Sequence, residues 1–229
     1  MRTLRFIGAL IGALAFGAFA VATANAAETL WRWLPGSAGE TFTGKSGKST
    51  FEIKGGNVTT CTASEIGAKT GELLKEGSTE GKDATLALVI SKLTGCKAFG
   101  LFPINSKGDP AEVILLHLEI HNCVIKSGDF GLLFTLLEVT LEVPAAKEVL
   151  VLKGSFIGLV EANKGKENDF LVNIKQKGGV QEIERCEGGE FNTLFSSLNG
   201  GAFIQTGIEV SEFLLAFDKV KDAKEEIML

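Results

Sequence analysis

Both histidines of the chain fall within residues 116–123. On an extended strand successive side chains point to opposite faces, so His117, Glu119 and His121 would share one face with Cys123. Two imidazoles and a carboxylate are ligands that zinc and similar ions accept, with water completing the coordination. His117, Glu119 and His121 are therefore the candidate metal ligands of the chain.

The spacing of this triplet limits what it can bind. Its outer members lie about 13 Å apart on a strand, so neighbouring members would share one ion and another strand would supply the remaining ligands. The alternative is that the triplet forms the wetter face of a half-buried strand, with Cys123 in a disulfide. We favour that alternative because the pattern has low specificity, and we predict no cofactor.

A second chemical motif lies at residues 39–46, which fit the phosphate-binding pattern G-x-x-x-x-G-K-[ST] letter for letter. Such a loop follows a buried strand and opens a helix. Here it follows a Pro/Gly/Ser stretch and leads into an expected strand, so nucleotide binding is not predicted. The chain has no G-x-S-x-G elbow, and no pair of carboxylates stands out. We predict that the protein is not an enzyme and has no catalytic residues.

The N-terminus predicts export. Arg2 and Arg5 precede an apolar run over residues 6–22, and Ala24 and Ala26 suit a signal peptidase. We expect residues 1–26 to be removed and the mature protein to be secreted or extracellular, with retention in the cell envelope as the alternative. No later apolar run reaches about 18 residues without a charge or a break, so no transmembrane segment is expected after cleavage.

Four cysteines follow the signal: Cys61, Cys96, Cys123 and Cys186. An even number in an exported chain indicates two disulfides, for which three connectivities exist. Pairing of sequence neighbours is favoured, and each bridge would then stabilise the fold by about 3–4 kcal/mol in the chain-entropy treatment. No C-x-x-C pair is present, so the cysteines do not follow a zinc-binding pattern.

The composition favours many short strands. Glycine occurs 28 times and tyrosine is absent. Glycine weakens helices but serves turns and bulges. The formal net charge of −5 provides no electrostatic footprint for nucleic acid or for an anionic membrane surface. We therefore expect an envelope, glycan or protein partner of unknown identity, and no nucleic acid.

Strand patterns recur along most of the mature chain. They lie at residues 50–54, 58–61, 85–93, 112–126, 132–143, 149–156, 170–175, 180–184, 202–210 and 212–217. The segments 112–126 and 132–143 are joined by the Ser127-Gly128-Asp129 turn, which predicts a β-hairpin at the centre of the core.

These elements predict a mainly β fold with one domain. We expect a signal peptide over residues 1–26, an extended lead-in over 27–48, a β domain over 49–217 and a charged C-terminal helix or tail over 218–229. The β domain is predicted to be a single antiparallel β-sandwich or a closed β-barrel, braced by the disulfides.

Several short motifs occur in a recognisable order. N-V-T-T-C at 57–61, G-E at 71–72 and L-T-G-C at 93–96 are followed by two further cysteines and G-S-F-I-G at 154–158. This order resembles a group of uncharacterised, cysteine-containing secreted β proteins of soil bacteria, over about residues 30–210. The resemblance implies an extracellular β fold, and it implies no established activity.

The function predicted from these features is a non-catalytic binding or structural module, secreted or held at the cell surface. One alternative is a barrel-type carrier of apolar ligands, because residues 115–143 are rich in leucine and an eight-stranded barrel can enclose a small ligand. Another alternative is a metal-dependent secreted enzyme that uses the strand with His117, Glu119 and His121.

Overall fold

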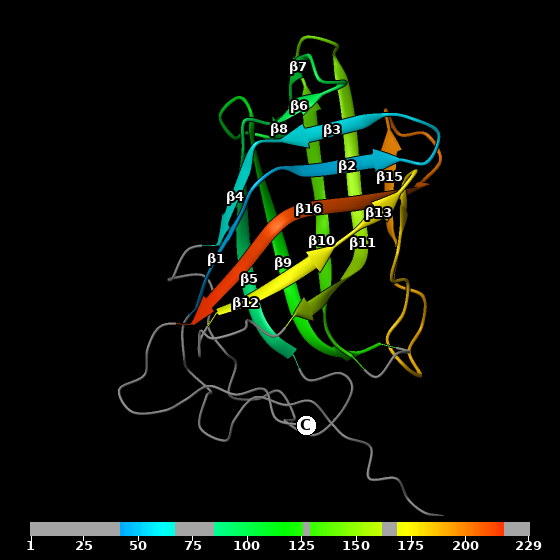
Figure 1. Ribbon diagram of the computed structural model, residues 1–229. Helices are drawn as coiled ribbons and strands as arrows, with labels where there is room; N and C mark the ends of the chain where they lie inside the picture. The colour runs from blue at the N-terminus through cyan, green and yellow to red at the C-terminus, as the bar shows by residue number, and fades with distance from the viewer. Residues whose placement is uncertain (1–41, 67–84, 126–128, 162–168, 218–229) are drawn as a thin grey trace, which may run out of the picture.

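The computed structural model describes residues 42–66, 85–125, 129–161 and 169–217, and every regular element within these ranges is a β-strand (Figure 1). The expected signal peptide and C-terminal helix or tail lie outside these ranges. The strands are β1 Phe42–Ser46, β2 Ser49–Ile53, β3 Val58–Cys61, β4 Ala63–Ile66, β5 Thr85–Thr94, β6 Lys97–Ala98, β7 Phe102–Pro103, β8 Asn105–Ser106, β9 Val113–Val124, β10 Phe130–Val143, β11 Glu148–Glu161, β12 Asp169–Ile174, β13 Gln176–Lys177, β14 Val180–Gln181, β15 Leu194–Leu198 and β16 Ile204–Phe217.

Eight of the strands close into an antiparallel barrel. Their order is β1-β4-β5-β9-β10-β11-β12-β16, and β1 completes the ring by pairing with β16. A closed ring leaves no unpaired strand edge in the barrel wall. Of the two predicted architectures, the sandwich and the closed barrel, the structure has the barrel. Strand β1 lies within the segment that was expected to be an extended lead-in.

Three barrel strands continue beyond the ring and carry further strands at the upper end of the molecule (Figure 1). The first half of β16 pairs with β2, and β3, β6 and β7 follow in order. Strand β15 bridges β11 and β16, and β8 pairs with β10. This upper end therefore shares its long strands with the barrel.

Strand β16 replaces the two separate strands expected at 202–210 and 212–217. Its register with β12 shifts between Val172, which pairs with Phe213, and Ile174, which pairs with Val210. One extra residue on β16 makes this a β-bulge, and Glu212 has a positive φ of 53° there. A bulge bends its strand, so a single β16 serves first the upper end and then the barrel.

The predicted central hairpin is confirmed. Strands β9 and β10 pair antiparallel, from Val124 opposite Phe130 to Leu118 opposite Leu136. Alternate side chains of β9 are buried, as its period-two pattern predicted. The ring of Phe134 on β10 stacks on Phe156 at 5.0 Å between ring centroids, so aromatic side chains pack against one another inside the barrel.

Two disulfides brace the fold, and they join sequence neighbours as predicted. Cys61 bonds to Cys96, and Cys123 bonds to Cys186. Disulfides persist in oxidising compartments, so these bonds indicate that the protein works in an oxidising environment. Within the described ranges there is no helix of the length and hydropathy needed to span a membrane.

Candidate functional site

The candidate metal ligands lie on the outer face of β9. His117 is exposed, and His121 Nε2 lies 3.5 Å from Glu119 Oε2. Cys123 follows them in the alternation, but its sulfur is bonded to Cys186. Across the described ranges, no three His, Cys, Asp or Glu side chains lie close enough together to hold a metal ion. The structure therefore brings His121 close to Glu119, and the residues that it describes supply no third ligand to this pair.

We expect the mature protein, purified without chelator, to retain far less than one zinc per chain, because a protein zinc site uses three or four protein ligands. Elemental analysis of the wild-type protein and of His121→Ala measures this directly. One zinc per chain that is lost in His121→Ala would instead establish a metal site on β9. His117→Ala would then show whether the third member of the triplet contributes.

The described part of the phosphate-loop match belongs to the barrel wall. Its residues 42–46 form β1, in which Gly44 and Lys45 pair with β16 on one side and with β4 on the other. A phosphate loop must turn several backbone N–H groups toward one anion. A strand that is paired on both sides instead directs its N–H groups to the neighbouring strands. Residues 42–46 therefore do not have the backbone arrangement of a phosphate-binding loop.

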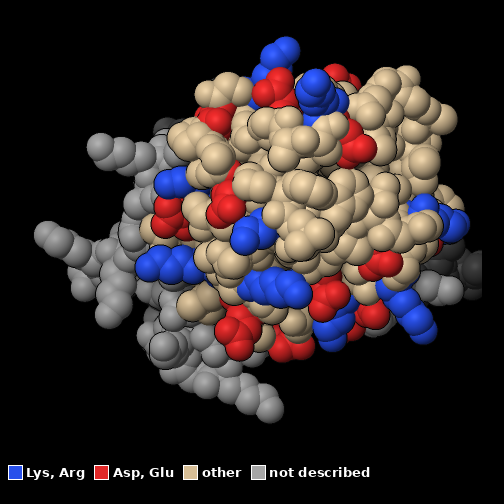
Figure 2. Space-filling model, turned by 90° about the horizontal axis from the view of Figure 1, so that it is seen from above, with Lys and Arg blue, Asp and Glu red and all other residues tan. Residues whose placement is uncertain are grey.

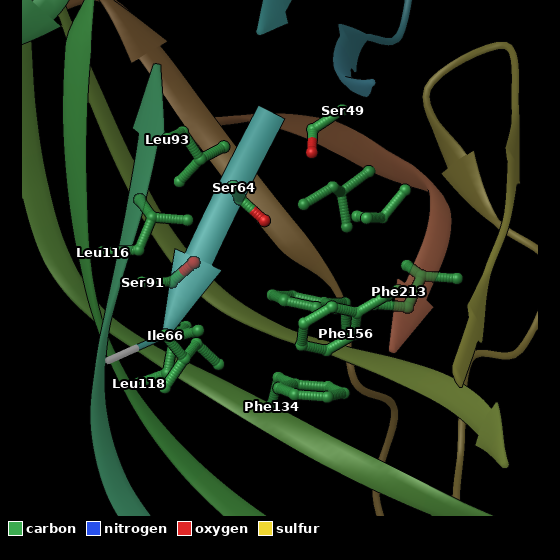
Figure 3. Close-up of a pocket in the computed structure, with 13 residues that line it drawn as sticks. Ser49, Ser64, Ile66, Ser91, Leu93, Leu116, Leu118, Phe134, Phe156 and Phe213 are labelled. Carbon is green, nitrogen blue, oxygen red and sulfur yellow. The ribbon is translucent and has the colours of Figure 1, made fainter. Parts of the chain in front are cut away.

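Three serines face a small cavity inside the barrel (Figure 3). Ser49, Ser64 and Ser91 come from β2, β4 and β5, and the other ten lining residues are apolar. The cavity volume is about 30 Å³. Because one water needs about 10–15 Å³, the cavity has room for two or three waters and not for a lipid. The sequence analysis did not single out these serines.

An exposed apolar group lies at the upper end of the molecule. We call Phe99, Leu101 and Phe102, which lie in and beside the β6–β7 turn, the hairpin tip. The exposed fractions of these residues are 40%, 73% and 37%. The rings of Phe99 and Phe102 meet edge to face at 6.5 Å. Figure 2 views this end from above and shows Lys, Arg, Asp and Glu side chains interspersed around a broad area that carries no charge.

The backbone of the hairpin tip is strained. Phe99 and Gly100 both have positive φ, 54° and 69°, as a type I′ turn requires. The N–H of Leu101 donates to the carbonyl of Ala98 at 3.0 Å and closes the turn. A bulky side chain in this region is uncommon and costs about 1–2 kcal/mol. Strain of this kind concentrates at functional sites, which makes the hairpin tip a candidate site.

The hairpin tip is anchored to the upper end from both sides. The N–H of Phe99 donates to the carbonyl of Val58 at 2.8 Å, and β6 pairs with β3. Just before β6, Cys96 is bonded to Cys61 at the end of β3. The N–H of Ile104 donates to the carbonyl of Cys96 at 3.2 Å. These bonds fix the backbone from which the exposed side chains project.

A shallow pocket of about 20 Å³ lies beside the hairpin tip. Phe99, Val58, Ile104 and Leu198 contribute to its apolar lining, together with Glu148. The Oε2 atom of Glu148 is buried and accepts no hydrogen bond from the residues that the structure describes.

No family model, no curated protein and no solved structure matches the chain. Of the three candidate sites, the histidine strand lacks a third ligand among the described residues. The serine cavity is small, and the hairpin tip offers large apolar side chains directly to solvent. The sequence analysis missed the hairpin tip, although K-A-F-G-L-F-P at 97–103 places three large apolar residues around a glycine.

Proposed function

We propose that this protein is a non-catalytic binding module, secreted or held at the cell surface, and that the hairpin tip is its contact surface. The observation that carries this proposal is the exposure of three large apolar side chains on a strained turn beside a disulfide. The oxidising environment indicated by the disulfides supports an extracellular location. The resemblance to secreted proteins of soil bacteria points the same way.

Burial of the hairpin tip would supply binding free energy. Removing apolar surface from water is worth roughly 25 cal/mol per Å². A contact surface that is already fixed loses little conformational entropy when it binds, so more of that free energy appears as affinity.

The chemistry of the hairpin tip favours a protein partner over a glycan. Phe99 and Phe102 meet edge to face, which leaves no broad flat platform for a sugar ring. An aromatic and aliphatic cluster is instead typical of the centre of a protein interface. We therefore propose a protein of the cell envelope or of the surroundings as the partner.

The proposal is tested with a variant that carries Phe99→Ser, Leu101→Ser and Phe102→Ser. Fluorescently labelled, oxidised protein is added to intact cells of the source organism, and the cell-bound fraction is measured over a range of concentrations. We expect at least a tenfold loss of affinity, because a single residue at an interface centre is commonly worth about 2 kcal/mol. Thermal unfolding of the variant checks that the barrel is intact.

Leu137→Ser provides the matched control, since Leu137 is 52% exposed on β10. We expect this control to bind like the wild type. A folded triple variant with wild-type affinity would contradict the proposal. An equal loss in both variants would also contradict it, because the binding would then reflect general stickiness of apolar surface.

The two alternative functions have less support. A lipid carrier needs a cavity far larger than about 30 Å³. A metal-dependent enzyme needs a third ligand beside His121 and Glu119, and none lies there within the described ranges.

A further inference from the structure

Three phenylalanines are exposed on the side of the molecule that carries β15 (Figure 1). Phe191, Phe195 and Phe203 are 62%, 39% and 43% exposed, and we call them the aromatic face. Phe195 on β15 pairs in register with Lys153 on β11, and the Nζ of Lys153 lies 3.9 Å from the ring centroid of Phe203. Phe195 and Phe203 therefore lie on either side of one lysine.

Phe191 precedes β15 and is held on the same side of the barrel. The hydroxyl of Ser155 on β11 donates to Asn192 Oδ1 at 3.0 Å, directly beside Phe191. Arg185 forms a β-bridge with Phe191, and its Cζ lies 4.0 Å from the ring centroid. Cys186, the next residue, is in a disulfide. These contacts attach the segment around Phe191 to the outer side of the barrel.

Unpaired negative charge borders the aromatic face. The segment before Phe191 carries four glutamates, and Arg185 is the one Lys or Arg within residues 178–217. The glutamates are Glu182, Glu184, Glu187 and Glu190. None of their carboxylates forms an ion pair with a residue that the structure describes. Glu184 accepts a hydrogen bond from Gln205 at 3.4 Å, and Gln205 pairs in register with Phe195, so the charge adjoins the rings.

We propose that the aromatic face is a second contact surface, and that it binds a basic polypeptide segment in which Lys or Arg alternates with apolar side chains. The apolar side chains of the partner cover the exposed rings, and its cations meet the glutamates. Complementary charge selects such a partner, because an acidic segment would be repelled. Aromatic residues are enriched in the buried part of protein interfaces.

The two cations on the aromatic face do not cancel this charge. Arg185 covers one side of the Phe191 ring, and Lys153 lies 3.9 Å from Glu138 Oε2. The hairpin tip lies at the upper end of the molecule, so the aromatic face does not depend on the function proposed for the tip (Figure 1).

The test measures binding of a fluorescent Arg-Leu repeat peptide to the mature, oxidised protein by anisotropy. We expect saturable binding, and at least a tenfold loss of affinity when Phe191→Ser and Phe195→Ser are combined, since residues at an interface centre are commonly worth about 2 kcal/mol each. A Glu-Leu repeat peptide of the same length should not bind. The hairpin-tip variant should bind the Arg-Leu peptide like the wild type, so the two proposals can fail separately.

Two charge variants separate a specific surface from general attraction to an acidic protein. The first combines Glu184→Gln, Glu187→Gln and Glu190→Gln, and we expect at least a tenfold loss and a weaker dependence on salt. The matched control removes the same charge from exposed residues elsewhere, through Glu65→Gln, Glu161→Gln and Glu212→Gln. It should bind within about threefold of the wild type, because distant exposed charges are screened.

Three results would overturn the proposal. The first is an absence of saturable binding to the wild type. The second is wild-type affinity in the folded Phe191→Ser, Phe195→Ser variant, because the peptide would then be held by charge alone. The third is an equal loss in the two charge variants. All these substitutions lie at the surface, so we expect thermal unfolding to show an intact barrel in each variant.

Discussion

Replacing Cys123 and Cys186 with serine is expected to lower the free energy of unfolding by about 4 kcal/mol. The bond links residues 63 positions apart, and the entropy that a cross-link removes from the unfolded chain grows with the length of the loop it closes. It also holds the segment around Cys186 against the outer face of the barrel, where Ile125 and Ile157 form a small apolar cluster with both cysteines. Equilibrium unfolding in urea measures the loss.

The matched control replaces Cys61 and Cys96, whose separation is 35 residues. We expect a smaller loss there, since the closed loop is shorter. A loss below about 1 kcal/mol for the Cys123–Cys186 pair would contradict the account, because packing alone would then hold the segment.

Phe134→Ala is expected to cost about 3–5 kcal/mol of unfolding free energy, the range for a fully buried aromatic residue. Phe134 is 1% exposed, stacks on Phe156 and contacts Phe213 at 6.0 Å between ring centroids. The neighbouring strands have little room to close the resulting cavity. A Cβ atom at Gly158, for example, would lie only 2.4 Å from Val172.

Phe195→Ala is the control for this prediction, because Phe195 is 39% exposed on β15. We expect it to cost less than about 1 kcal/mol, as surface substitutions do. Comparable losses in the two variants, measured by urea unfolding, would show that the barrel centre is not the main packed core. Phe134→Leu should recover part of the loss, since it restores most of the apolar volume.

The strands could be predicted because they depend on local patterns, whereas the disulfide pairing was one of three possible connectivities and agrees with the one that was favoured. Buried side chains alternate with partly or fully exposed ones along β9 from Val113 to Asn122, and β9 pairs antiparallel with β10. The choice between sandwich and barrel could not be predicted, because closure depends on β1 meeting β16 at the far end of the chain. Strand β1 is also hard to recognise in the sequence, because it lacks the alternating apolar residues that predict a strand. At Gly44 there is no space for a side chain, since a Cβ atom would lie 3.1 Å from Leu215 and from Phe213.

The candidate sites depend even more on tertiary structure. The turn at Phe99 and Gly100 lacks the usual Asn-Gly signal, so the sequence does not announce a hairpin whose tip exposes phenylalanine. The inward position of Ser49 depends on how β2 pairs with β16. The sequence placed His117, Glu119 and His121 on one face correctly, but it could not show whether another strand supplies a third ligand.

Native mass spectrometry of the mature, oxidised protein, purified from an exporting host without chelator, most directly tests whether the barrel is a filled, disulfide-braced scaffold that works through its surface. The account predicts a mass per chain that is four hydrogens below the reduced value, because two disulfides form, with no bound metal or lipid. An excess mass of one zinc or one lipid per chain would contradict it. The function would then lie at the histidine strand or inside the barrel.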